Sequence, residues 1–148
     1  MNTLRIATAC VLNPEGQLLL VRKRGSRFWM LPGGKIDGTE TALQALLREL
    51  QEELQWQAAD TPWQSLGHFE NRAANEANTQ VQAQVFYTQH RPSLQLQIAA
   101  EIEAMQWWPL DGSMDDSFAP LLCEMVVPAL LAALQRPQAS SKLGSPEK

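Results

Sequence analysis

Three glutamates and an arginine lie close together near residue 50. Residues 33–56 read GGKIDGTETALQALLRELQEELQW, and Glu49, Glu52 and Glu53 have the three- and four-residue spacings that bring side chains together on a helix. Such like charges repel and raise each other's pKa, and Arg48 neutralises only part of them. Oxygen ligands without Cys or His favour magnesium or manganese over zinc. The cluster therefore predicts a divalent-cation site, and the alternative is a solvated acidic helix face.

A glycine turn comes shortly before this acidic cluster. In the sequence Leu31-Pro32-Gly33-Gly34, two glycines follow a proline. Glycines let backbone carbonyl and amide groups approach a ligand, because no Cβ stands in the way. The glycine turn, the helix start and the acidic cluster together predict a site for a polyphosphate and a metal ion.

The same stretch resembles the Nudix box: Gly, five residues, Glu, seven residues, Arg-Glu, an aliphatic residue, any residue, Glu-Glu, any residue, Gly and a bulky apolar residue. The residues that match in register are Gly34, Glu40, Arg48, Glu49, Leu50, Glu52, Glu53 and Trp56. Gln55 departs from the pattern, which has glycine where the helix should end in a left-handed residue. A non-glycine there costs about 1 kcal/mol unless the helix ends differently. In the family a glycine usually comes directly before the first glutamate of the box, whereas here Thr39 separates Gly38 from Glu40. The loop is therefore expected to bend differently.

The resemblance implies a role for each matched polar residue. It implies that Mg²⁺, with Mn²⁺ as a substitute, is held by the carboxylates and one carbonyl of this segment, those of Glu49, Glu52, Glu53 and Gly33. Either Glu53 or Glu49 would be the general base, and Arg48 and Glu40 would hold the ligating carboxylates in place. An acidic residue near a later strand acts in some family members as a base or an extra ligand, and Glu101 is the residue chosen here.

Basic residues cluster just before the glycine turn. They are Arg22, Lys23, Arg24 and Arg27. Some of them are expected to face solvent only. In members of the resembling family, basic residues at this strand end contact substrate phosphates, which implies phosphate binding by Arg22 and Lys23, next to the backbone of Gly34. Arginine offers a fork that suits phosphate oxygens, whereas lysine acts as a point charge.

Length and composition favour one globular domain. The 148 residues suit a single core, so we expect a domain over residues 1–136 and a mobile tail over 137–148. A formal charge of −4 and a pI of about 5.1 argue against general binding to nucleic acid or to an anionic membrane. Cys10 and Cys123 form neither a metal pair nor a disulfide framework. With no signal pattern and no membrane-spanning run, we expect a cytoplasmic protein.

The acidic segment is expected to be an amphipathic helix. Thr39 or Thr41 would cap it, and Glu40 would lie in its first turn. One apolar stripe that packs on a sheet is predicted by leucines at spacings of three and four, Leu43, Leu46, Leu47, Leu50 and Leu54.

The rest of the chain alternates between strands and turns. A hairpin is predicted from residues 4–12 and 17–22. Further strands are predicted over 63–70, 79–90 and 105–110. A second helix is predicted over 118–135, with a kink or a break at Pro128. A mixed sheet with one helix on each side gives an α/β/α sandwich. The resemblance implies the same fold.

Several other polar and aromatic residues have more modest expectations. Residues 28–30 should be core or pocket wall, 71–78 a hairpin loop, and 111–116 a pocket rim. The glutamines of 79–90 could hydrogen-bond a base or simply face solvent. His68 and His90 lack ligand spacing. Of Trp107 and Trp108, at least one could be exposed at a homodimer contact.

The predicted activity is hydrolysis of a phosphoanhydride in a nucleotide. The substrate-specific tags that the family uses for ADP-ribose, dinucleoside polyphosphates and NADH are absent. By elimination we expect a nucleoside or deoxynucleoside triphosphate, including oxidised or non-standard forms. The alternatives are an ADP-ribose or nucleotide-sugar pyrophosphatase, and a catalytically silent nucleotide sensor. An isoprenoid diphosphate isomerase on the same fold needs a reactive thiol over the pocket, and both cysteines lie in apolar stretches.

Overall fold

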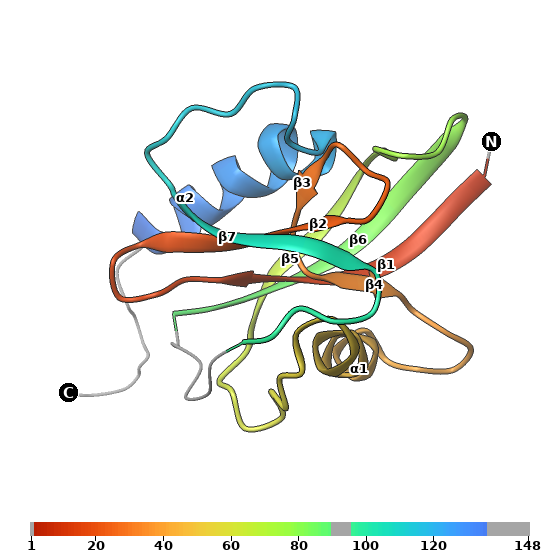
Figure 1. Cartoon of the computed structure of the whole chain (residues 1–148), viewed down its shortest axis with the longest axis horizontal. Coiled ribbons are helices and arrows are strands. Elements are labelled where there is room, and N and C mark those ends of the chain that lie inside the picture. Colours follow the sequence, from red (N-terminus) through yellow and green to blue (C-terminus); the bar gives the residue numbers. More distant parts are fainter. Residues whose placement is uncertain (1, 90–95, 136–148) are drawn as a thin grey trace.

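The structure is a computed structural model of the whole chain, and it describes residues 2–89 and 96–135. Its elements are β1 (Asn2–Val11), β2 (Gln17–Lys23), β3 (Trp29–Met30), β4 (Gly33–Lys35), α1 (Ala42–Leu54), β5 (Gln64–Arg72), β6 (Thr79–Thr88), β7 (Ile102–Pro109), the π-helical stretch η1 (Leu121–Val126) and α2 (Val127–Gln135). Figure 1 shows α1 on one side of the strands and α2 on the other, so the predicted α/β/α sandwich is confirmed. His90 and the predicted tail lie outside the described residues.

The strands form two sheets, where the sequence analysis expected one. The first has the order β4-β1-β6-β5, and the second has the order β3-β2-β7. β1 runs parallel to β6 and antiparallel to β4, so the first sheet is mixed. The predicted hairpin pairing of β1 with β2 is wrong. One antiparallel bridge joins Leu12, the residue after β1, to Leu18, and β2 pairs instead with β7 along its whole length.

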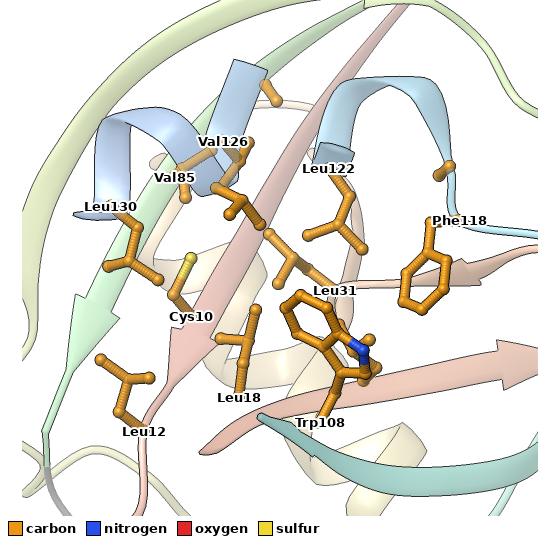
Figure 2. Close-up of a cluster of buried hydrophobic side chains, with 14 of the residues drawn as sticks. Cys10, Leu12, Leu18, Leu31, Val85, Trp108, Phe118, Leu122, Val126 and Leu130 are labelled. Atoms are coloured by element: carbon orange, nitrogen blue, oxygen red, sulfur yellow. The ribbon is translucent and has the colours of Figure 1, made fainter. Parts of the chain in front are cut away.

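Burial of β2 on both faces explains this arrangement. Its residues Leu18 and Leu20 belong to the core on the η1 and α2 side, whereas Leu19 and Val21 belong to the core on the α1 side. Four consecutive buried residues are typical of a strand covered on both faces. Figure 2 shows Leu18 beside Trp108 of β7, with Leu122 and Leu130 covering the same cluster.

α1 begins with a capping box. The Thr41 hydroxyl accepts from the Gln44 N–H at 3.1 Å, and the Gln44 side chain accepts from the Thr41 N–H at 2.9 Å. These two bonds satisfy donors that a helix start leaves free. Thr41 is therefore the cap. Glu40 precedes it, so the predicted place of Glu40 in the first turn is wrong.

The apolar stripe of α1 is covered only from its second turn onward. Leu46, Leu50 and Leu54 are fully buried, as predicted, whereas Leu43 in the first turn is 37% exposed. At the other end, Gln55 adopts the left-handed conformation (φ 53°) that the sequence analysis assigned to this position. Its N–H donates to the Gln51 carbonyl at 3.1 Å.

The C-terminal helix changes its winding just before Pro128, where the sequence analysis expected a kink or a break. η1 is wound as a π-helix up to Val126, and α2 continues as an α-helix from Val127. Proline lacks the N–H that a regular helix requires, which favours irregular winding in the preceding turn. Trp108 is buried and Trp107 is half-buried against the α1-side core, so neither is the exposed tryptophan that was expected. Among the described residues, no helix combines the length and the apolar character needed to cross a membrane.

Candidate active site

The three glutamates of α1 differ sharply in exposure. At about 100° per residue, Glu53 lies about 60° around the helix from the buried Leu50, Glu49 about 100° and Glu52 about 160°. Exposure follows this order. Glu53 is 2% exposed, the Glu49 side chain 15% and the Glu52 side chain 52%. The cluster therefore runs from the edge of the core to solvent.

Glu53 holds one bound and one unbound carboxylate oxygen. Its Oε1 accepts a hydrogen bond from the Gly33 N–H at 3.1 Å. Its Oε2 is buried and has no partner among the described residues. Burial raises the pKa of Glu53 to about 8, the hydrogen bond from Gly33 opposes this, and the charge of Glu49 adds to the increase. An unpartnered buried oxygen is costly, so this arrangement calls for a proton or a cation at Oε2.

The two glycines of β4 fit against different neighbours. Gly33 has φ 138°, and a Cβ there would overlap the backbone of Ala7 and Thr8. A Cβ on Gly34 would overlap the carboxyl group of Glu49. Close approach therefore requires glycine at both positions, once for the sheet and once for the acidic cluster.

The pairing of β4 turns the Gly33 backbone away from β1. The Ala9 N–H donates to the Pro32 carbonyl and the Ile36 N–H to the Arg5 carbonyl, each at 3.0 Å. Inter-strand bonds alternate in an antiparallel pair, so the N–H and C=O of Gly33 both point outward from this edge strand. The N–H meets Glu53 there, and the carbonyl lies on the same side.

Arg48 ties the loop before α1 to the acidic cluster. It donates to Glu40 at 2.8 and 3.0 Å, to Glu49 at 3.0 Å and to the Lys35 carbonyl at 2.9 Å. The predicted contact with Glu52 is present at 3.6 Å. The hydrogen bond with Arg48 lowers the pKa of Glu40 to about 2. The Arg48 guanidinium thus fixes the Glu40 side chain and orients the Glu49 carboxylate.

Sequence reasoning missed one member of this network. Asp37 lies 3.4 Å from Arg48, and its N–H donates to Glu40 at 2.9 Å. The sequence could have indicated Asp37, because it lies three residues before Glu40, the separation of a tight turn.

The donor set suits a hard divalent cation, although the carboxylates do not already form a metal cage. Within residues 2–89 and 96–135, no three His, Cys, Asp or Glu side chains are grouped as a ready metal site. One Glu49 oxygen is bound to Arg48, and the half-exposed Glu52 side chain lies 3.6 Å from the same arginine. The unpartnered Oε2 of Glu53 is nevertheless the kind of oxygen ligand that magnesium and manganese prefer.

The predicted phosphate-binding residues both have acidic partners. Lys23 Nζ lies 3.3 Å from Glu101, and Arg22 lies 3.9 Å from Glu103 and 4.9 Å above the ring of Trp29. Lys23 also lines a pocket beside β4, together with Gly33 and Gly34, whereas Arg22 does not line it. The charge of Lys23 lowers the pKa of Glu53 and the charge of Glu101 raises it, both less than burial does. Arg24 and Arg27 bind backbone carbonyls at an exposed surface.

A pocket of about 180 Å³ opens beside β4, on the face of the sheet opposite α1. Apolar side chains dominate its wall, Leu4, Ile6, Met30, Leu31, Val81, Ala119, Pro120, Leu121 and Leu122. Thr8 also lines it, and its buried hydroxyl has no partner in the part of the chain that the structure describes. The predicted rim, residues 111–116, does not line this pocket. Val81 of β6 lines it, and the neighbouring glutamines do not.

Sequence reasoning missed two parts of the pocket wall. Residues 73–76 follow β5, and residues 119–122 begin the C-terminal helical region. Both approach the pocket through tertiary packing, and neither carries a motif. The only hint was the predicted hairpin loop over 71–78.

Comparison with known proteins gives a consistent result. The profile of the NUDIX domain matches residues 2–121. A putative 8-oxo-dGTP diphosphatase of Bacillus subtilis is 43% identical over 53 residues, 36% of each chain. An RNA pyrophosphohydrolase of Halorhodospira halophila is 42% identical over 50 residues, 34% of this chain and 28% of the relative. These matches thus span about a third of each curated relative. A MutT NUDIX hydrolase from Burkholderia pseudomallei is similar in structure, with a TM-score of 0.65, 25% identity, and coverage of 78% of this chain and 89% of the other.

Proposed function

Because the chain belongs to the Nudix family, we propose that it is a pyrophosphohydrolase that depends on a divalent cation. It cleaves a phosphoanhydride bond in a nucleoside diphosphate that is linked to another group. One observation carries this proposal. The buried Glu53 carboxylate has one oxygen without a partner among the described residues, and it lies beside Glu49 at the edge strand whose glycines line the pocket.

The reaction is the attack of water on phosphorus. The water oxygen bonds to the phosphorus, the bridging P–O bond breaks, and the leaving group departs with the bridging oxygen. For a triphosphate cleaved between the α and β phosphorus atoms, the products are a nucleoside monophosphate and pyrophosphate. Glu53 or Glu49 accepts the proton that water loses, and Arg48 keeps Glu49 oriented for this role.

The proposed cation ligands are carboxylates and one carbonyl, those of Glu49, Glu52, Glu53 and Gly33. A bound Mg²⁺ or Mn²⁺ would supply neutralisation of the charge that develops on the phosphoryl oxygens. Glu40 acts through Arg48 to hold the Glu49 carboxylate. Of the two predicted basic residues, Lys23 is better placed than Arg22 to meet a substrate phosphate, because Lys23 lines the pocket, as Lys35 also does. Arg22 is proposed as a second contact for substrate phosphates, and Glu101, 3.3 Å from Lys23, as a supporting acidic residue.

The proposed substrate is a nucleoside or deoxynucleoside triphosphate, including oxidised or non-standard forms. Among the relatives, one is named for 8-oxo-dGTP and another for RNA. The apolar pocket wall suits a base-sized ring next to a charged phosphate edge. Both cysteines are free thiols, which supports the cytoplasm as the place of action.

The proposal is tested by measuring phosphate release in a pyrophosphatase-coupled assay with magnesium. The panel contains standard and oxidised nucleoside triphosphates, ADP-ribose, dinucleoside polyphosphates and an RNA with a 5′ triphosphate. A phosphatase coupling detects the nucleoside monophosphate from substrates that release no pyrophosphate. Glu53→Gln is the test variant. Glu15→Gln, in the exposed 13–16 turn, is the matched control.

We expect turnover of triphosphates by the wild type and by Glu15→Gln, with a loss of about 1000-fold or more in Glu53→Gln. Preferential turnover of ADP-ribose would assign the alternative substrate class. Nucleotide binding that requires magnesium, without turnover of any compound, would overturn the hydrolase and support a sensor.

A further inference from the structure

One wall of the pocket is a short chain segment that crosses from β5 to β6. We call residues 73–76 the strap. All four of its residues line the pocket, and so do Leu121 and Leu122 of η1. The strap and η1 are therefore both parts of the wall of one pocket.

A pair of side chains at the base of the strap binds η1 directly. Arg72 donates to both carboxylate oxygens of Glu124, at 2.8 and 3.2 Å. Asn71 donates to Glu124 as well, at 3.0 Å. The bonds from Asn71 and Arg72 hold the pKa of Glu124 below its ordinary value. A two-pronged arginine contact with a third donor fixes direction as well as distance.

The position of this contact on η1 links it to the pocket. Glu124 belongs to the same π-helical stretch as Leu121 and Leu122, whose side chains form the wall. Irregular π-helical winding is frequent at functional sites. The Arg72 and Glu124 side chains are 65% and 45% exposed, so this ion pair contributes little to overall stability. Its geometric effect on the pocket is a better account of its role.

A second contact fixes the other side of the strap. The Ser26 hydroxyl donates to Oδ1 of the Asn75 side chain at 3.1 Å and accepts from the Phe28 N–H at 3.0 Å. The strap is therefore held between η1 and the loop that precedes β3.

We propose that Glu124 is a positioning residue for substrate specificity. Through Asn71 and Arg72 it fixes the strap against η1, and so sets the width of the slot that receives the base of the nucleotide. This inference rests on the proposed function for the identity of the ligand. The slot is lined mainly by aliphatic side chains, so a flat ring is held by fit between its walls. A wider slot binds every base less tightly and discriminates less between large and small bases.

The test compares two exposed ion pairs. Glu124→Ala breaks the contact at the strap, and Asp116→Ala breaks the pair with Arg27, which is 3.9 Å long and outside the pocket. KM and kcat are measured with one purine and one pyrimidine triphosphate, and thermal midpoints are recorded. A charge-swapped double variant, Arg72→Glu with Glu124→Arg, restores an ion pair at the same place. Each change is also made in the Glu53→Gln background, where calorimetry reports nucleotide affinity without turnover.

We expect Glu124→Ala to raise KM for the preferred nucleotide about tenfold, because a pocket wall that is no longer fixed in advance must be ordered when the nucleotide binds. The kcat should stay within about twofold, the purine-to-pyrimidine preference should shrink, and the double variant should recover part of both. Asp116→Ala should leave all these values unchanged.

Equal behaviour of Glu124→Ala and Asp116→Ala would overturn the proposal. A fall in kcat and thermal midpoint without a change in base preference would do the same, because that pattern belongs to a purely structural residue. If nucleotides bind but are not hydrolysed, the calorimetric affinities still decide the role of Glu124 while the hydrolase proposal fails. No binding by any form would overturn both.

Discussion

Gln55 ends α1 in a left-handed conformation that suits glycine. Its φ is 53° and its side chain is exposed, so the residue bears the backbone cost without a packing gain. Gln55→Gly should therefore raise the free energy of unfolding by about 0.5–1 kcal/mol. Urea unfolding followed by tryptophan fluorescence measures this change.

Gln57 provides the control for this substitution. It is also exposed, and its φ is not positive. Gln57→Gly should lower stability, because the added freedom of the unfolded chain is not offset by relief of strain. Equal effects of the two substitutions would show that the left-handed conformation carries no cost.

Substitutions at Gly33 and Gly34 should affect different properties, stability at Gly33 and activity at Gly34. A methyl group on Gly34 meets the flexible end of Glu49, which can move away, so Gly34→Ala should fold normally. The displaced carboxylate should cost about 100-fold in kcat/KM. Circular dichroism and the coupled phosphate assay measure the two effects.

Gly33→Ala is the contrasting variant. Its methyl group meets backbone, which cannot move away, and φ 138° is unfavourable for alanine. We expect a loss of about 2–4 kcal/mol in unfolding free energy. An active Gly34→Ala protein would show that the position of Glu49 does not matter for the reaction.

At the scale of elements, Arg48 joins the loop before α1 to the helix itself. Its bond with Glu40 lowers the pKa of that carboxyl to about 2 from an ordinary value of 4.5. A lowered folded-state pKa gives stability that is present above about pH 4.5 and lost as the pH falls towards 2. Glu40→Gln should therefore be less stable than the wild type at pH 6, and the difference should close near pH 2. Urea unfolding across this pH range measures it.

Glu15→Gln is the control, because Glu15 lies in the exposed 13–16 turn away from Arg48. Its stability should follow the wild type at every pH. A Glu40→Gln gap that stays constant down to pH 2 would contradict the assigned cause.

Local patterns predicted the elements far better than their partners. The helical period and the cap signal located α1, because both depend on neighbours within four residues. Whether the first turn is buried depends on distant parts of the chain that pack against it, so the exposure of Leu43 could not be predicted from local patterns. The partner of β2 is β7, whose paired residues lie 79 to 92 positions further along the chain, and no hairpin rule detects a pairing at that distance. The contact of Glu53 with Gly33 and the approach of the strap to η1 were hidden for the same reason.

At the scale of the whole molecule, two cores flank the sheets. Val126 belongs to the core beside η1 and α2, and Val21 belongs to the core beside α1, both almost fully buried. Val126→Ala and Val21→Ala should each cost about 1–3 kcal/mol in unfolding free energy. In the double variant these costs should add within about 0.5 kcal/mol, because the sites share no packing cluster. Guanidinium unfolding of the four proteins measures the coupling.

A pair from one core is the matched comparison. Val126 and Leu122 belong to one cluster, so Val126→Ala combined with Leu122→Ala should depart from additivity. Strong coupling between Val126 and Val21 would mean that the two cores respond as one.

The parallel pairing of β1 with β6 has a consequence for the newborn chain. During synthesis, each residue of β1 can pair with β6 only after the chain has grown by another 77 residues. At about 5–20 residues per second, translation takes about 4 to 15 s to deliver that partner. During this interval β4, which is synthesised much earlier, is the neighbour of β1 that becomes available first. A ribosome paused before β6 would therefore hold an apolar strand with one edge open, and this is the moment at which chaperone binding or aggregation competes with folding.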